Sequence, residues 1–186
     1  KGKLIDFGGW ELPVENQGII SEHKMVRSKA GMFDVSHMGE VEVTGGRSLE
    51  YLNNLLTNDF TDMAVGQIRY SPMCYEHGGV VDDLMVCKFS PTHYFLVINA
   101  ANTKKDIAWM QKQAFSQGVT ITDVSDGFAE IALQGPLAQE ILQPLCDADL
   151  AAIKYYYFLP HVQVSGVDCL LSRTGYTGED GFEIYM

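Results

Sequence analysis

The sequence is poor in the features that mark several common kinds of partner. It has 13 lysine and arginine residues against 24 aspartate and glutamate residues, and its formal net charge is −11. Because affinity for a phosphate backbone depends on clustered basic residues, this balance argues against a nucleic-acid partner. No apolar run approaches the roughly 20 residues that a membrane-spanning helix needs, and the first ten residues lack the order of a signal peptide. We therefore expect a soluble globular protein without a membrane partner.

Cysteine and histidine patterns that build disulfides or metal sites are also missing. The four cysteines form no CxxC pair and lie among apolar residues, at positions 74, 87, 146 and 169. This pattern is typical of reduced core residues and favours a reducing compartment, with a bacterial cytoplasm as the default expectation. The five histidines show neither HxH nor HxxxH spacing. No local metal site is therefore predicted.

Familiar catalytic and nucleotide-binding motifs are absent as well. The glycines at 175, 178 and 181 do not follow the GxGxxG spacing, and no GxxxxGK[ST] segment occurs. Ser36 and Ser165 lack a GxSxG context. These absences argue against nucleotide phosphate binding and against a serine hydrolase.

The apolar periodicity predicts a mixture of helices and strands. Helices are predicted at 19–30, 48–56, 102–115 and 137–145, and strands at 40–44, 69–75, 80–89, 93–99, 119–124, 129–133, 163–165, 168–173 and from 182 onward. Turn residues at 77–79 and 90–92 make the segment 69–99 an antiparallel meander. Residues 32–39 are apolar but interrupted by polar side chains, which predicts a buried irregular segment.

This order of elements predicts an α+β fold with two packed domains. Residues 1–40 and 137–186 would form a first, discontinuous domain, and residues 41–136 an inserted ferredoxin-like domain with the order βαβββαββ. The chain begins at Lys1 rather than methionine and stops at Met186 inside an alternating apolar pattern. We therefore expect a truncated chain whose first domain is incomplete at its C-terminal end.

The segment 172–186 contains three evenly spaced glycines, several ionisable side chains and Tyr176. Glycine allows positive φ and close approach to a ligand, so the segment is a candidate site loop. The alternative is an ordinary surface turn before an edge strand. The aromatic run at 155–158 also has two possible interpretations. It could pack in the core, or it could form a platform that binds a flat ring.

Two adjacent aspartates, Asp82 and Asp83, interrupt a strand that is apolar on both faces. At least one carboxylate must then lie in or beside a core, where an isolated charge costs several kcal/mol unless it is paired or hydrogen-bonded. A buried carboxylate of this kind is a candidate acid or base with a perturbed pKa. The alternative is one structural aspartate and one exposed to solvent, and strand alternation alone cannot choose between the two residues.

Seven segments carry motifs that occur together in one known family. They are DFGGWELP (6–13), GMFDVSHMGE (31–40), LTND (56–59), GGVVDDL (78–84), VINAAN (97–102), LQGP (133–136) and SRTGYTGEDGFE (172–183). In this order and spacing the chain resembles the aminomethyltransferases, the T-proteins of the glycine cleavage system, over all 186 residues. Members of this family are about twice as long, so the resemblance implies an N-terminal half.

The resemblance implies a three-domain cloverleaf fold with tetrahydrofolate in a central cavity and no metal. The family's third domain would be absent here, together with an arginine that helps to position the ligand, so this fragment alone is expected to be inactive. The implied reaction takes the aminomethyl group from the lipoyl arm of H-protein, releases ammonia and forms 5,10-methylenetetrahydrofolate. H-protein and the other glycine cleavage proteins are the implied partners, in the bacterial cytoplasm or the mitochondrial matrix.

By position in the motifs, Asp83 resembles the family's essential carboxylate, which also contacts folate, and Asp82 resembles its structural neighbour. The resemblance assigns further contacts with the pterin and aminobenzoyl groups to Met38, Tyr70, Asn99, Tyr156, Tyr176 and Glu183. Glu183 is suited to accept hydrogen bonds from pterin N–H groups.

Two other readings share the folate-binding architecture. One is a related folate-dependent demethylase, including the C-terminal modules of dimethylglycine and sarcosine dehydrogenases. The other is a folate-binding protein without transferase activity, such as the relatives linked to iron–sulfur maintenance, whose Lys-Gly-Cys-Tyr motif does not occur in this sequence.

Overall fold

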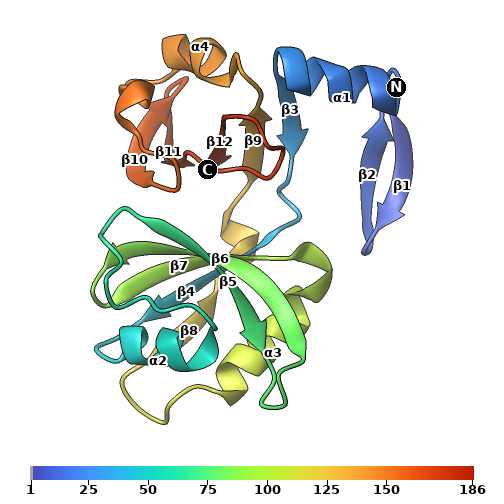
Figure 1. Ribbon diagram of the computed structural model, residues 1–186. Helices are drawn as coiled ribbons and strands as arrows, with labels where there is room; N and C mark the ends of the chain where they lie inside the picture. The colour runs from blue at the N-terminus through green and yellow to red at the C-terminus, as the bar shows by residue number, and fades with distance from the viewer. Residues whose placement is uncertain (1) are drawn as a thin grey trace. The chain divides into compact units, whose positions relative to one another are not determined.

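The computed structural model describes residues 2–186, and they separate into two compact units (Figure 1). Unit 1 contains the described residues up to His37 together with Ala129–Met186. Unit 2 is the continuous segment Met38–Phe128. The chain therefore leaves unit 1, completes unit 2 and returns, as an inserted domain does.

Unit 2 is built on a five-stranded antiparallel sheet in the order β5-β6-β7-β4-β8. Its strands are β4 (Gly39–Thr44), β5 (Ile68–Cys74), β6 (Val80–Ser90), β7 (His93–Ile98) and β8 (Thr120–Asp123). Its helices are α2 (Ser48–Leu55) and α3 (Thr103–Lys112), with the short 3₁₀ turns η1 (Ala100–Asn102) and η2 (Ser125–Gly127). The predicted meander from β5 to β7 is confirmed.

The core of unit 2 lies between α2, α3 and one face of this sheet. Alternate residues of β7, namely Tyr94, Leu96 and Ile98, belong to this core because successive strand side chains point to opposite faces. In α2, Tyr51, Leu52 and Leu55 share one helical face and are buried there. The Tyr51 hydroxyl donates to the Met110 carbonyl oxygen of α3 at 2.7 Å, which ties the two helices together. The packed sheet thus supports the residues at its strand ends.

Unit 1 contains a second five-stranded antiparallel sheet in the order β10-β11-β12-β9-β3. Its strands are β3 (Gly31–Asp34), β9 (Glu130–Gln134), β10 (Phe158–Val164), β11 (Val167–Ser172) and β12 (Gly181–Tyr185). The helix α4 (Ala138–Leu142) and the turns η3 (Gln143–Leu145) and η4 (Leu150–Ala152) follow β9. Buried residues from α4, β10, β11 and β12 form the core of this unit.

The start of unit 1 forms a hairpin and a helix. The strands β1 (Lys3–Phe7) and β2 (Trp10–Glu15) pair around Gly8 and Gly9, whose φ angles of 64° and 95° suit glycine in a tight turn. The helix α1 (Ile19–Ser28) follows, and none of its residues is fully buried. Within residues 2–186, no helix is both long enough and apolar enough to cross a membrane.

Two expectations from the sequence are corrected. Residues 31–34 form the regular edge strand β3, not a buried irregular segment, and the Met32 side chain is 73% exposed. Residues 130–134 were expected in the inserted domain, yet β9 pairs with β3 and β12. The inserted unit therefore has the order βαβββαβ and ends at residue 128, not at 136. The physical reason is burial, since Ala132 and Leu133 are covered within the sheet of unit 1.

Candidate functional site

The residues assigned to the site by resemblance divide between the two units. Met38, Tyr70, Asp83 and Asn99 belong to unit 2, whereas Tyr156, Tyr176 and Glu183 belong to unit 1. Each unit presents its own polar arrangement around these residues.

The register of β6 separates the two adjacent aspartates. Asp82 shares a face with Leu84 and Val86, which pack into the core beneath α2 and α3, and only 7% of its surface is exposed. Asp83 points to the opposite face and is partly exposed. Its carboxylate oxygens make no hydrogen bond within residues 2–186, while its backbone N–H donates to Asp82 Oδ1 at 2.9 Å. The structure thus leaves the Asp83 side chain available to a ligand.

Asp82 is the centre of a hydrogen-bond network. Besides the Asp83 N–H, it accepts from Asn99 Nδ2 at 2.9 Å and from Asn102 Nδ2 at 2.8 Å. Burial disfavours its charge, but hydrogen bonds from Asp106, the Asp83 N–H and the two amides outweigh burial and lower the pKa of Asp82. Asn99 Nδ2 also lies 3.1 Å from the Asp83 carbonyl oxygen. This network fixes the backbone at Asp83.

Met38 and Asn99 lie at the same end of the sheet as Asp83. Ile98 of β7 pairs with Leu84 of β6 and with Gly39 of β4. Asn99 follows Ile98, the last residue of β7, and Met38 precedes Gly39, the first residue of β4. Both residues therefore lie at the end of the sheet where Asp83 and Leu84 are found in β6. The sheet therefore gathers a carboxylate, an amide and a thioether at one edge of unit 2.

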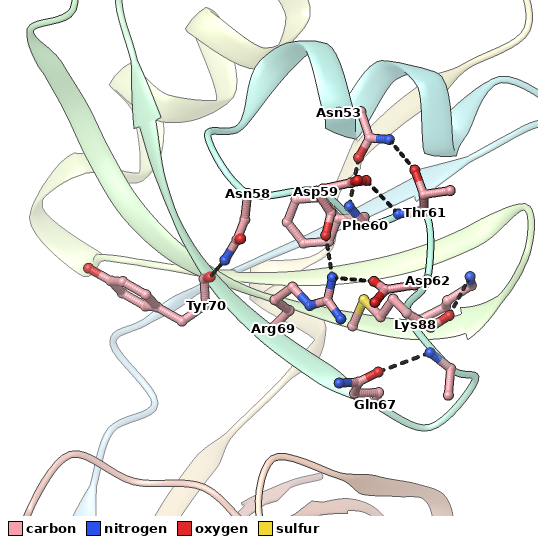
Figure 2. Close-up of polar contacts among 12 residues, drawn as sticks. Asn53, Asn58, Asp59, Phe60, Thr61, Asp62, Gln67, Arg69, Tyr70 and Lys88 are labelled. Atoms are coloured by element: carbon pink, nitrogen blue, oxygen red, sulfur yellow. Dashed lines mark hydrogen bonds and ion pairs between the residues drawn. The ribbon is translucent and has the colours of Figure 1, made fainter.

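Tyr70 comes from β5 and shares the face of Asp83. Tyr70 pairs with Met85 and Pro72 with Asp83, and partners across an antiparallel pair project from the same face. The Tyr70 residue is 45% exposed, and its carbonyl oxygen accepts from Asn58 Nδ2 at 2.9 Å. Figure 2 shows the ring extending away from the polar contacts of Arg69, which holds Asp62 at 2.8 Å. The ring therefore lies on the Asp83 face of the sheet and is partly exposed to solvent.

Glu183 is a nearly buried carboxylate in the middle of β12. It is 5% exposed and pairs with Ser172 on one side and Ala132 on the other. Its Oε2 atom accepts hydrogen bonds from Thr174 Oγ1 and, at 3.4 Å, from the Tyr185 hydroxyl. Burial raises the pKa of Glu183, and these two hydroxyl donors only partly oppose the rise. A ligand carrying N–H groups would supply the donors that this carboxylate lacks.

Tyr156 has an unusual backbone conformation. Its φ is 60°, a region that non-glycine residues seldom adopt, and its N–H donates to the Arg173 carbonyl oxygen at 3.0 Å. Burial, then the neighbouring charges of Tyr155 and Glu183, raise the pKa of the Tyr156 phenol. Strained residues of this kind gather at functional sites. The aromatic run thus places one ring beside the buried carboxylate.

Tyr176 lies in the loop between β11 and β12 and is 91% exposed. It lines a cavity of about 730 Å³ together with residues of the N-terminal hairpin, α1 and β3. Among residues 2–186, no hydrogen bond joins it to Glu183. Within unit 1, the charge of Glu183 acts on the Tyr156 phenol, whereas Tyr176 lines an open cavity.

Most of the polar side chains in this loop hold its own shape. Arg173 donates to Asp180 through Nε at 2.9 Å and Nη2 at 2.6 Å. A Cβ atom added at Gly175 would fall 1.9 Å from the Oε1 atom of Gln134, whose Nε2 donates to the Thr174 carbonyl oxygen at 3.0 Å. The glycine is thus required by close packing around Gln134. The loop thus has a fixed shape, carries Thr174 and Tyr176, and leads into β12, which contains Glu183.

Sequence reasoning missed several polar residues that surround the two carboxylates. Asn102 and Asp106 adjoin Asp82, and Thr174 and Tyr185 adjoin Glu183. One signal was present for Asp106, which shares the apolar face of α3 with Ile107 and Met110. A carboxyl at such a position must be buried. No comparable signal marks Asn102 or Thr174.

The described part of the chain offers no arrangement typical of a metal centre. Within residues 2–186, no group of three or more histidine, cysteine, aspartate and glutamate side chains is placed to hold a metal ion. All four cysteines are free, and Cys87 and Cys169 are buried.

Comparison with known proteins adds a family and close relatives. The family model described as the GCVT N-terminal domain matches residues 1–186. The aminomethyltransferase of Desulfitobacterium hafniense strain Y51 is 61% identical over 184 residues, which are 99% of this chain and 50% of that protein. The aminomethyltransferase of Alkaliphilus metalliredigens strain QYMF is 56% identical over 186 residues, 100% of this chain and 50% of that protein. The chain thus spans about half the length of the curated relatives it matches.

Solved structures also resemble this chain. The glycine cleavage system aminomethyltransferase T from Bartonella henselae matches with a TM-score of 0.90 at 33% identity, over 100% of this chain and 50% of that one. The heterotetrameric sarcosine oxidase from Corynebacterium sp. U-96 matches with a TM-score of 0.62 at 15% identity, over 90% of this chain and 82% of that one. The second likeness is one of fold alone.

Proposed function

Because the chain belongs to the family of the GCVT N-terminal domain, we propose that it is the folate-binding half of an aminomethyltransferase of the glycine cleavage system. The complete protein takes the aminomethyl group from the lipoyl arm of H-protein and transfers its carbon to tetrahydrofolate. Ammonia and 5,10-methylenetetrahydrofolate are the products. H-protein and the other glycine cleavage proteins are the proposed partners, and the cytoplasm is the proposed compartment.

The observation that supports this proposal most strongly is the different placement of the two adjacent aspartates. Asp82 is buried and accepts bonds from three N–H donors, whereas the Asp83 carboxylate has none within residues 2–186. A carboxylate with a fixed backbone and unoccupied oxygens can accept or hold a proton in a reaction. It can also stabilise a positive charge that develops on a nearby carbon.

In this proposal Asp83 acts near the folate nitrogens that receive the carbon unit. Its carboxylate holds or removes a proton there and stabilises the iminium-like carbon during transfer. Asn99 holds Asp83 in place through two hydrogen bonds, because its amide donates both to the Asp82 carboxylate and to the Asp83 carbonyl oxygen. Met38 and Tyr70 offer apolar and aromatic surface at the same sheet.

Glu183 is proposed to bind the pterin end of the folate. Its Oε1 atom accepts no hydrogen bond within residues 2–186, and the amino and ring N–H groups of a pterin are donors that match a carboxylate. Tyr156 supplies a ring beside it, and Tyr176 a ring in the open cavity. Because Glu183 is nearly buried, the hydrogen bonds from the pterin N–H groups to its carboxylate are stronger than they would be in water.

The alternatives remain a folate-dependent demethylase and a folate-binding protein without transfer activity. The fold likeness to a sarcosine oxidase is compatible with the first of these. Neither alternative explains relatives that are named aminomethyltransferase at 61% and 56% identity over nearly the whole chain.

The experiment follows the carbon unit in the full-length protein, meaning these residues joined to the C-terminal half that the relatives carry. Aminomethylated H-protein and tetrahydrofolate are mixed with the enzyme, and ammonia and 5,10-methylenetetrahydrofolate are measured together. We expect ammonia and 5,10-methylenetetrahydrofolate in equal amounts. Turnover of a methylated glycine instead of the H-protein substrate would establish a demethylase, and folate binding without either turnover would establish a non-catalytic protein.

A further inference from the structure

A second buried carboxyl group lies against Asp82. Asp106, in α3, is fully buried, and its segment lies against β6, because Asn102 donates to Asp82 and Lys105 donates to the Val81 carbonyl oxygen. Asp82 and Asp106 perturb each other's pKa. No donor nitrogen or hydroxyl within residues 2–186 reaches hydrogen-bonding distance of either Asp106 oxygen. Lys105 Nζ lies 3.6 Å from Asp106 Oδ1 but donates to the Val81 carbonyl oxygen at 2.6 Å. Asp106 therefore lacks the donors that a buried negative charge requires.

The two carboxyl groups cannot both be ionised in such contact. Two like charges that face each other in a buried place force one group to keep a proton. Asp82 accepts three bonds from N–H donors, so the negative charge belongs on Asp82 and the proton on Asp106. Burial first, and then the hydrogen bond and charge of Asp82, raise the pKa of Asp106 to about 7.

The shared proton completes the environment of Asp82. An ionised carboxylate has about four positions for accepting hydrogen bonds. The N–H of Asp83, the amides of Asn99 and Asn102, and the acid O–H of Asp106 supply four donors. Two of these donors belong to residues that the proposed function places against folate. A disturbance at Asp106 is therefore transmitted through Asp82 to both of them.

We propose that Asp106 is a positioning residue of the folate site, which, as a neutral acid, completes the hydrogen bonding of Asp82 and so holds Asp83 and Asn99 in place. The proposal rests on the proposed function, because Asp83 and Asn99 matter to catalysis only if they face the folate. When pH rises, Asp106 loses its proton to solvent and a second negative charge faces Asp82. Two titratable groups face Asp106: Asp82 raises its pKa, and Lys105 lowers it.

Three variants of the full-length protein test the role of Asp106. Asp106→Asn keeps an N–H donor for Asp82 but cannot ionise, whereas Asp106→Ala removes the donor. Asp126→Asn is the matched control, because Asp126 is an exposed aspartate of the same unit. For each protein, kcat and KM for aminomethyl transfer are measured between about pH 6 and pH 9, a range that includes the raised pKa of Asp106.

We expect Asp106→Ala to lose roughly two- to tenfold in kcat at neutral pH, the size of coupling within one hydrogen-bond network. Asp106→Asn should stay close to the parent at neutral pH and exceed it increasingly as pH rises. The control should follow the parent throughout. Parallel pH profiles for the parent and Asp106→Asn would overturn the proposal, because a merely structural carboxyl would leave that ratio unchanged.

A second measurement separates this inference from the proposed function. Carboxyl carbon-13 spectra of the full-length protein, labelled in its aspartates, are followed from acid to about pH 9. One carboxyl should titrate near neutrality and disappear from the spectrum of Asp106→Asn. If every aspartate titrates in the ordinary acidic range, the shared proton and with it the positioning role are wrong, even where transfer activity stands. If the titration is present but folate transfer fails in the parent, the proposed function is wrong, and the positioning role goes with it.

Discussion

Asp82 in unit 2 and Glu183 in unit 1 are both strand carboxylates with little exposed surface, 7% and 5% respectively. Their surroundings differ in the donors they offer. Asp82 accepts from a backbone N–H and two amides, and its pKa is lowered. Glu183 accepts from two hydroxyl groups, both on Oε2, and its pKa is raised by burial.

This difference indicates different roles. A buried carboxylate whose acceptor positions are filled by its own protein contributes to the fold, because nothing remains for a ligand to satisfy. A buried carboxylate with an unfilled oxygen is costly until a donor arrives, and such a residue is a candidate binding group. Asp83, beside Asp82 but facing the other way, is the reactive member of the unit 2 pair in this account.

The largest effect is expected from Asp83→Asn in the full-length protein. The amide cannot accept a proton as the carboxylate does, so transfer should fall by about 10²- to 10⁴-fold, the usual contribution of a general acid or base. Folate binding should remain largely intact, because Asp82 still holds the backbone. Product formation and folate titration on the same preparation check this, and equal rates for variant and parent would remove Asp83 from the mechanism.

Asp82→Asn should lower stability much more than it lowers the intrinsic rate of transfer. Loss of the charged acceptor weakens three hydrogen bonds, and we expect a loss of about 2–3 kcal/mol in the free energy of unfolding. The pKa of Asp82 is below its ordinary value of 3.8 in the folded state, so its stabilisation is present above that value and disappears as pH falls through the folded pKa.

Urea unfolding of Asp82→Asn and the parent at a series of pH values measures this contribution. The difference between the two proteins should be largest near neutral pH and should shrink in acid. A constant difference across the whole range would mean that Asp82 acts by packing and not by charge.

A smaller effect is expected at Tyr156, whose φ of 60° is costly for a residue with a Cβ atom. Tyr156→Gly relieves this strain, which is worth about 1 kcal/mol, but it removes the ring beside Glu183. The variant should therefore be nearly as stable as the parent and bind folate more weakly. Tyr156→Phe is the control, since it keeps both the ring and the strain. Unchanged folate affinity in Tyr156→Gly would exclude a contact.

Much of the fold follows from local signals in the sequence. Turn residues at 77–79 and 90–92 delimit three strands that pair in order, so the meander in unit 2 was predictable. The partner of β9 was not, because 129–133 follows β8 along the chain and local pattern says nothing about which distant strand it joins. Its register with β12 depends on burial in a core formed by residues about 50 positions later in sequence.

For the site, too, local sequence signals predicted some features and missed others. The pattern of two aspartates within an apolar strand was enough to predict a buried carboxylate, and the structure identifies it as Asp82. Alternation could not choose between Asp82 and Asp83, because both faces of β6 are apolar and only the packing of α3 decides which face is the core. The role of Asp83 was taken from family resemblance, and it stays a prediction. Hydrogen bonds from Asn102 and Asp106 join residues from separate elements, which no local pattern reports.

The most direct test is a calorimetric titration of 5-formyltetrahydrofolate into the full-length parent and its Glu183→Gln variant, with Glu179→Gln, from the loop before β12, as a control. We predict binding to the parent and to the control, and a loss of about ten- to a hundredfold in affinity for Glu183→Gln, as expected when a charged hydrogen-bond acceptor is removed. Equal affinity for Glu183→Gln and the parent, or no binding to the parent, would contradict it.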